Sequence, residues 1–363
     1  MRTLEKLIIQ NFKSIRDQTL ALGRLNVFIG GNGAGKSNLI EVFKFLRELM
    51  SERLGEYTAK KGGADALLHF GRKKSPAMFL KLLFGEGDNA HSYELGLMGT
   101  LDDTLMISHE QAYDHGRDKF DQPHPWQASF ISRESKLKQD NRPCTRQVVH
   151  DLENCRVYHF HDTSDTAAVK GTCDVEDNRF LRPQADNLAA FLYWMQQKQP
   201  DHFQNISDTI RQIAPFFAEF RLEPSKLNES KIRLEWRERS SDAYFNASSL
   251  SDGTLRFCCL ATLLLQPDLP AVILLDEPEL GLHPEAVNLL AGLLESASTR
   301  TQVIVATQSV TLVNQLTPES VWTVDRENGQ SVFRHLSGAD MSGWLEGYSL
   351  GELWEKNLLG ARP

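Results

Sequence analysis

The stretch Gly30-Gly31-Asn32-Gly33-Ala34-Gly35-Lys36-Ser37 stands between two regular sequence patterns. Before it, the β-branched and aromatic run 25–29 is typical of a strand, and after it, residues 37–50 carry apolar side chains at a helical spacing. The stretch fits the phosphate-binding pattern G-x-x-x-x-G-K-[ST] at every specified position. A glycine turn between strand and helix is the alternative. The context favours a phosphate site, because the N-terminus of a helix attracts anions.

A second stretch, Val272-Ile273-Leu274-Leu275-Asp276-Glu277-Pro278-Glu279, is an apolar run that ends in acidic residues. This pattern predicts a buried strand with Asp276 at its end, where the carboxylate and the Ser37 hydroxyl hold Mg²⁺. Lys36 is expected to reach the β- and γ-phosphates, and Glu277 lies beside the metal ligand. The two stretches together predict a nucleoside triphosphate site with ATP and Mg²⁺ as ligands and hydrolysis as the reaction.

A third stretch, residues 249–256, precedes a predicted helix and lies 25 residues before Asp276, counted from Ser251. Ser251, Asp252 and Gly253 at a helix N-terminus offer free N–H groups, a hydroxyl and a positive dipole end, which suit a second phosphate contact. The alternative is an ordinary N-cap, with Ser251 or Asp252 capping the helix. Its position between the glycine loop and the acidic strand end favours the phosphate contact.

Composition limits the other functions. The chain has 363 residues, 41% hydrophobic and 24% charged, with a formal charge of −8. These values are ordinary for a soluble protein, and DNA binding would require a local basic patch. Five cysteines without C-x-x-C spacing indicate reduced thiols. The N-terminus lacks the pattern of a signal peptide, and the apolar runs are too short for a membrane span, so a cytoplasmic protein is expected.

Periodicity predicts the organisation of the chain. Two short strands are expected at 4–10 and 18–22, and three antiparallel strands at 78–84, 92–98 and 104–112, separated by turns such as residues 85–89. The polar residues 114–146 predict a surface loop, residues 187–217 predict helices, and residues 231–237 alternate as in one half-buried strand. Alternating helices and strands then imply a parallel sheet; they are expected at 254–265, 271–275, 285–296, 302–306 and 310–315.

The order of these motifs resembles a known family. Asn11-Phe12-Lys13-Ser14, the glycine loop, Leu250-Ser251-Asp252-Gly253, the acidic segment 276–284 and Thr307-Gln308-Ser309 follow one another as in the RecF/SMC branch of ABC-type ATPases, closest to its AAA15/AAA21 and OLD-like members. The resemblance implies an α/β fold: an ABC-type P-loop ATPase head with a mixed or parallel core sheet, an antiparallel β subdomain and a helical subdomain.

The resemblance also implies a division of the chain. Residues 1–185 would form the N-terminal ATPase lobe with the antiparallel subdomain, 186–240 the helical subdomain, and 241–340 the C-terminal ATPase lobe. Residues 341–363 would be an aromatic tail.

Roles for individual residues follow from the same resemblance. The phosphates would be held by Asn32, Gly33, Ala34, Gly35, Lys36, Ser37 and Asn38. Ser251, Asp252 and Gly253 would act in trans on ATP held by a second subunit, giving a head-to-tail homodimer or a higher oligomer, with the loop 280–283 at the interface. Glu277 would polarise the attacking water. Lys13 would lie near the base and ribose, although a solvated lysine is an equal alternative.

Gln308 departs from the family, whose switch residue is usually histidine. Glutamine donates and accepts hydrogen bonds but cannot take up a proton. We therefore expect Gln308 to orient the water and the γ-phosphate; the alternative is a polar residue with no catalytic part. Gln184 and Gln196 are candidates for the glutamine that follows the edge strand in this family.

Three further features have ordinary explanations. His159 and His161 share a strand face, but no third ligand is visible, so a metal there is not expected. Cys258 and Cys259 are expected in the core. Trp344, Tyr348 and Trp354 either pack back on the protein or form a partner-binding strip.

The predicted role is a sensor or regulatory ATPase of a DNA-directed system, foremost antiphage defence, acting with a separate nuclease- or toprim-like effector. No acidic cluster resembling a nuclease site is visible, and about 55 residues after Gln308 are few for a further domain. Two alternatives stay open: a RecF-like DNA-repair ATPase, and a nucleotide-gated scaffold with little turnover. A membrane partner is not expected.

Overall fold

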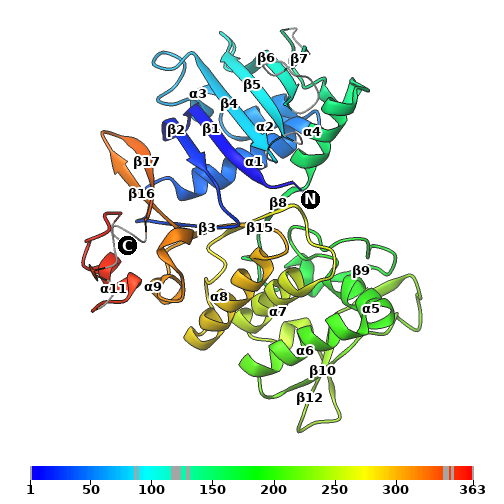
Figure 1. The fold of residues 1–363 in the computed structure, drawn as a ribbon. Coiled ribbons are helices and arrows are strands. Elements are labelled where there is room, and N and C mark those ends of the chain that lie inside the picture. Colours follow the sequence, from blue (N-terminus) through cyan, green and yellow to red (C-terminus); the bar gives the residue numbers. More distant parts are fainter. Residues whose placement is uncertain are drawn as a thin grey trace.

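A six-stranded mixed sheet forms the centre of the molecule (Figure 1). The computed structural model describes residues 2–85, 87, 90–115, 124–127, 131–337, 343–344 and 347–361. Five neighbouring strands of this sheet are parallel and the sixth, β17, is antiparallel, as predicted for an ATPase head. The strand order is β17 (Gln330–His335), β16 (Val321–Glu327), β3 (Leu25–Ile29), β15 (Gln302–Thr307), β14 (Val272–Asp276) and β8 (Cys155–Tyr158).

Two hydrophobic cores cover the two faces of the central sheet. Along β14, Val272 and Leu274 point to one core and Ile273 and Leu275 to the other, as the period of two in a strand requires. The first core contains α1 (Lys36–Met50), α4 (Pro143–Glu153) and the antiparallel sheet, and the second contains α7 (Asp252–Leu265), α8 (Pro284–Ser298) and α9 (Val310–Val313). The glycine-loop helix α1 and the helix α7 therefore lie on opposite faces.

The antiparallel sheet is confirmed beside α1. Its six strands pair only antiparallel in the described residues. The turn predicted at 85–89 lies partly outside those residues. In sheet order the strands are β2 (Ile15–Ala21), β1 (Leu4–Phe12), β4 (Ala77–Phe84), β5 (His91–Gly99), β6 (Leu105–Asp114) and β7 (His124–Gln127), and short helices α2 (Leu54–Lys60) and α3 (Ala64–Leu67) follow α1.

The prediction of a surface loop over 114–146 is wrong. Strand β7 and a short 3-10 helix, Leu137–Gln139, interrupt it, and α4 begins at Pro143. Proline fits the first turn of a helix, which has no intrahelical partner for its N–H, so Pro143 marks a helix start here. Cys144, Val148 and Leu152 follow at helical spacing and are buried. Residues 116–123 and 128–130 of the predicted loop lie outside the described residues.

The helical subdomain follows the edge strand β8. Helices α5 (Leu188–Lys198) and α6 (Pro200–Ile213) confirm the predicted pattern, although the second ends before residue 217. The single strand expected at 231–237 is two strands in different sheets: β11 (Lys231–Arg233) pairs with β9 (Thr172–Asp174), and β12 (Glu235–Glu238) pairs with β10 and β13. The remaining elements here are β10 (Phe217–Arg221), β13 (Tyr244–Asn246) and the 3-10 helices Ala168–Lys170 and Ala247–Ser249.

The C-terminal segment returns to the core. The 3-10 helix Pro318–Ser320 precedes β16, and α11 (Leu350–Glu355) packs against α9. Trp354 is fully buried, and its Nε1 donates to the carbonyl oxygen of Ala361. The prediction of Trp354 as a docking residue is therefore wrong, because an interface anchor must be accessible to the partner. Trp344 and Tyr348 remain exposed, and residues 338–342, 345–346 and 362–363 lie outside the described part of the tail.

Two smaller expectations concern the cysteines and the membrane. Cys258 and Cys259 are buried in α7, as predicted, and all five cysteines are free thiols. Among the helices of the described residues, none combines the length and apolarity that crossing a membrane requires.

Candidate nucleotide-binding site

The glycine loop connects β3 to the N-terminus of α1, as the sequence predicts. Gly35 precedes the helix with φ +117°, and a Cβ there would lie 1.9 Å from Oγ of Ser331, so only glycine fits. Two serines from distant segments hold the loop. Ser331 Oγ donates to the carbonyl oxygen of Ala34 at 2.5 Å, and Asn38 Nδ2 donates to Ser14 Oγ at 2.6 Å. Ser331 was not predicted, because only the fold brings β17 to this loop.

Lys36 lies inside this loop with 4% of its surface exposed. Its Nζ donates to the carbonyl oxygens of Gly30 at 2.5 Å and Gly31 at 3.1 Å. Burial lowers the pKa of Lys36, and the carboxylates of Glu277, Asp276 and Glu279 oppose this shift. The ammonium group therefore stands in the negative field of the acidic strand end.

The loop fits a chain of phosphates. In the described residues, no hydrogen bond occupies the backbone N–H groups of Gly33, Gly35, Lys36 and Ser37. Unpaired N–H groups at a helix N-terminus, next to a lysine, form an anion site. Asn32 and Gly33 are exposed at its mouth, whereas Ala34 is buried.

Ser37 and Asp276 are brought together from segments far apart in sequence. Ser37 Oγ donates to Oδ1 of Asp276 at 3.3 Å. Burial raises the pKa of Asp276, and the nearby Lys44 ammonium opposes that rise. A hydroxyl and a carboxylate at this distance fit Mg²⁺, which keeps water and phosphate oxygens as its other ligands. No cluster of three or more His, Cys, Asp or Glu suited to a metal occurs among the described side chains, so the protein would supply only part of the coordination.

Glu277 and Gln308 meet at the ends of neighbouring parallel strands. The N–H of Glu277 donates to the carbonyl oxygen of Ala306 at 2.7 Å, and Gln308 Nε2 donates to Glu277 Oε1. Glu277 has a left-handed backbone with φ 45°, which is uncommon for residues other than glycine and costs about 1–2 kcal/mol. The sheet thus holds the carboxylate in one direction, with the amide of Gln308 against it.

Glu279 lies beneath this pair and was not singled out by the sequence. Its Oε1 accepts hydrogen bonds from Thr307 Oγ1 at 2.5 Å and from the N–H of Gln308 at 3.2 Å. Its Oε2 is buried without a hydrogen-bond partner, and burial raises the pKa of this carboxyl group. Glu279 therefore fixes the backbone from which Gln308 reaches Glu277.

His161 contacts the end of β14 from the side of β8. Its Nε2 lies 2.7 Å from the carbonyl oxygen of Asp276, and its ring stacks on His159 with centroids 4.2 Å apart. Burial, and then the neighbouring His161, lower the pKa of His159 to about 4. The two rings thus stack, and the His161 ring also contacts the backbone at the end of β14. Gln184 lines a neighbouring cavity with Lys44 and His159, and Gln196 lies within α5.

The segment Ser251-Asp252-Gly253 begins α7. Ser251 is exposed and caps α7, because its Oγ accepts a hydrogen bond from the N–H of Thr254 at 3.2 Å; its contact with a phosphate stays a prediction. A Cβ at Gly253 would lie 2.5 Å from the carbonyl oxygen of Gly281, which brings the segment against the loop 280–283. The exposed segment thus begins a helix that packs on the face of the central sheet opposite α1.

Arg256 connects α7 to the other loops of the site. Its guanidinium donates to the carbonyl oxygens of Leu280 at 2.6 Å and of His161 at 2.9 Å. One side chain thus joins the helix after Ser251, the loop 280–283 and the segment that contacts Asp276.

Lys13 lies on the outer side of α1. Its backbone is left-handed, with φ 48°, and its Nζ is 3.8 Å from Oε1 of Glu41. Lys61 and Tyr57 contact the same oxygen, each at 2.5 Å. Burial lowers the pKa of Lys13. The structure therefore places Lys13 in a cluster around the buried Glu41, so it is not a fully solvated lysine.

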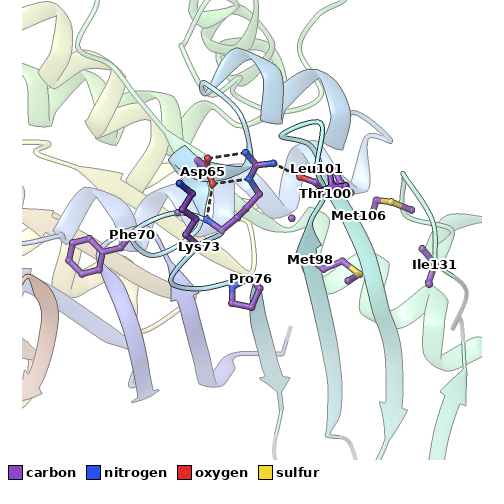
Figure 2. A pocket seen from close by; sticks show the side chains of 12 residues that line it. Asp65, Phe70, Lys73, Pro76, Met98, Thr100, Leu101, Met106 and Ile131 are labelled. Atoms are coloured by element: carbon purple, nitrogen blue, oxygen red, sulfur yellow. Dashed lines mark hydrogen bonds and ion pairs between the residues drawn. The ribbon is translucent and has the colours of Figure 1, made fainter.

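Another cavity lies away from the nucleotide site. It has a volume of about 1090 Å³ and is lined by the antiparallel subdomain. Figure 2 shows Met98 and Ile131 on one side and Phe70 on the other. Arg72 also lines the cavity, and its guanidinium donates hydrogen bonds to both carboxylate oxygens of Asp65. None of the predicted nucleotide-binding residues lines it, so this cavity is separate from the phosphate site.

Fold and site together define an ATPase domain of the ABC-type, SMC-like class. The chain belongs to the AAA_21 family, described as "AAA domain, putative AbiEii toxin, Type IV TA system", whose model matches residues 25–314. The comparison with curated proteins found no match.

Solved structures of Smc heads share the fold. One is an Smc head bound to the C-terminal winged-helix domain of ScpA, with a TM-score of 0.57, 16% identity, and coverage of 93% of this chain and 99% of that chain. A Pyrococcus furiosus Smc head bound to the C-terminal domain of ScpA has a TM-score of 0.56 and 15% identity, and the match covers 95% of this chain and 99% of that chain. A Pyrococcus yayanosii Smc head with a coiled coil and joint has a TM-score of 0.55 and 12% identity, and the match covers 95% of this chain and 99% of that chain.

Proposed function

We propose that this protein hydrolyses ATP with Mg²⁺. The observation that carries the proposal is the convergence of Ser37, Asp276, Glu277 and Gln308 beside a loop of unpaired N–H groups. Bound Mg²⁺ would neutralise charge on the phosphate oxygens.

The chain's own residues then have separate tasks. Lys36 neutralises charge on the β- and γ-phosphates, while Ser37 and Asp276 hold the metal. Glu277 accepts a proton from the attacking water, and Gln308 keeps its carboxylate in place. The hydrogen bond between Gln308 and Glu277 favours turnover over a scaffold that only binds ATP. Steady-state phosphate release with Mg²⁺, and its loss with EDTA, tests this function; ATP binding without release would support the scaffold instead.

We further propose that ATP closes a head-to-tail dimer. Two observations support this assembly: Ser251 is exposed at the start of α7, and α7 lies across the central sheet from the glycine loop. A second copy would bring its Ser251 to the γ-phosphate of the first. Light scattering of the Glu277→Gln protein tests this, because slow hydrolysis should preserve the ATP-bound dimer. A monomer at micromolar concentration with saturating ATP would contradict it.

The proposed biological role is a sensor or regulatory subunit in antiphage defence that acts with a separate effector. The family description, which names an AbiEii toxin and a type IV TA system, supports a defence role. Two of the similar Smc heads are bound to a domain of another protein, ScpA, which supports a separate partner. Co-purification with the product of the neighbouring gene tests the role. Cleavage of DNA by the purified protein, lost in Glu277→Gln, would contradict the separate effector.

A further inference from the structure

A polar cavity lies beside the nucleotide site and is lined by residues of α1, α2 and the end of β8. Its volume is about 500 Å³. Five cationic side chains line it: Lys44, Arg47, Arg53, Lys60 and Lys61. Only two carboxylates, Glu48 and Glu56, line the same walls. The cavity thus has an excess of three positive charges on a chain whose formal charge is −8.

The cations differ in how far carboxylates of the protein offset their charge, and the Lys44 ammonium lies near Asp276. Arg53 pairs with Glu48 at 2.8 Å, and Lys61 pairs with Glu41 at 2.5 Å. Among the residues that the structure describes, Lys44, Arg47 and Lys60 have no ion pair with a carboxylate. Arg47 and Lys60 are also exposed. Unpaired cations gathered on an acidic protein attract a polyanion, because their field is not cancelled by neighbours.

The cations are spread over two elements and not gathered at one point. Lys44 and Arg47 are three residues apart on α1 and share one face, whereas Lys60 ends α2. Such a spread suits several phosphates in a row better than one small anion. The cavity also borders the metal-binding end of β14, since His159 in its wall stacks on His161, which contacts the backbone of Asp276.

We propose that this cavity binds the phosphate backbone of a nucleic acid strand through Arg47, Lys60 and Lys44. The inference adds a nucleic acid contact to the proposed function and rests on that function only for its biological meaning. Contacts to phosphates carry no base sequence, so binding is expected without sequence preference. Such contacts release counterions, which makes the affinity depend on salt.

The test uses the full-length protein, a fluorescent single-stranded DNA of mixed sequence, and anisotropy over a series of NaCl concentrations. The double variant Arg47→Gln/Lys60→Gln should bind more weakly, and the slope of log affinity against log salt should become shallower by about 1.4, since each lost phosphate contact removes about 0.7. The matched control Lys198→Gln/Lys226→Gln removes two exposed lysines of the helical subdomain, and its slope should equal that of the unmodified protein.

A third variant separates this inference from the ATPase proposal. Lys36→Ala should lose ATP but keep its DNA affinity within about twofold, because independent sites do not couple. A loss of DNA binding in Lys36→Ala would mean that the strand occupies the ATP site, which overturns the inference. The inference would also be overturned if the slope of log affinity against log salt were the same for the cavity variant and the unmodified protein. Equal losses of DNA affinity in the cavity variant and the control variant would overturn it as well.

Discussion

Replacing Gln308 by alanine gives a demanding test of the catalytic arrangement. Gln308 Nε2 donates to Oε1 of Glu277, the carboxylate that we assign as the base. A hydrogen bond to a charged group contributes about 1.5–3 kcal/mol. Since about 1.36 kcal/mol corresponds to a tenfold change in rate, Gln308→Ala should lower kcat by about 10- to 150-fold. ATP affinity should change little, because Gln308 contacts the base and not the glycine loop.

The assay is steady-state phosphate release at saturating ATP and Mg²⁺. Glu277→Gln alone should lower kcat by about 10²–10⁴-fold. If Gln308 acts through Glu277, the double variant should be no slower than Glu277→Gln, because the effects of coupled residues do not add. Gln315→Ala, at an exposed glutamine just after α9, is the matched control and should keep full activity. An unchanged kcat for Gln308→Ala, or additive losses in the double variant, would refute the assigned coupling.

Three other changes test separate parts of the structure. Lys36→Ala removes the buried cation of the loop and should weaken ATP binding by at least about tenfold, as one charge-assisted hydrogen bond requires; unchanged affinity in calorimetry would refute the phosphate site. Glu279→Gln should raise the unfolding temperature at pH 7 more than at pH 4. Burial raises the pKa of Glu279 in the folded protein above its value in the unfolded chain. The stability of the unmodified protein is therefore lost as pH rises from the pKa of the unfolded chain through that of the folded protein, and the neutral glutamine avoids this loss. An equal change of unfolding temperature at both pH values would contradict this. Trp354→Ala should lower the free energy of unfolding by about 3–5 kcal/mol, measured in urea. The exposed Trp344→Ala should change it by less than about 0.5 kcal/mol; similar losses for the two tryptophans would show that Trp354 is not core.

The sequence alone predicted the parts of the site that depend on local pattern. The glycine loop, the strand ending in Asp276 and the helix that follows Ser251 are each specified within about ten residues, by glycine positions, apolar runs and helical spacing. Their assembly follows from one rule: parallel strands place their carboxyl ends at the same edge of the sheet. The contact between Ser37 and Asp276 could therefore be anticipated.

Residues that act through long-range packing could not be found in this way. Ser331 and Ser14 support the glycine loop from distant segments, and His161 reaches Asp276 from the segment after the neighbouring edge strand β8. Ser14 stands in the motif 11–14 and His161 in a histidine pair, but neither pattern reveals these partners, and nothing in the local sequence marks Ser331. Glu279 could have been noticed, because an acid so close to Glu277 must either be solvated or have buried partners.

Two errors in the predicted fold also come from packing that the local sequence does not show. Pro143 and the polar residues around it resemble a loop, yet proline also starts helices, and only the burial of Val148 and Leu152 decides between them. Trp354 in the tail resembled a docking anchor, but it is buried through the packing of α11 on α9 and the hydrogen bond to Ala361. An amphipathic aromatic residue suits a core and an interface equally well.

The most direct test of the account is complementation between two inactive variants. Lys36→Ala disables the glycine loop, and Ser251→Arg places a bulky cation at the exposed start of α7, so each protein alone should lack ATPase activity. In a head-to-tail dimer, mixing them in equal amounts creates hybrids with one intact composite site. Such random pairing should restore about a quarter of the normal turnover. Activity near that level is the predicted result, and a mixture as inactive as its components, with both proteins folded, would contradict the shared site.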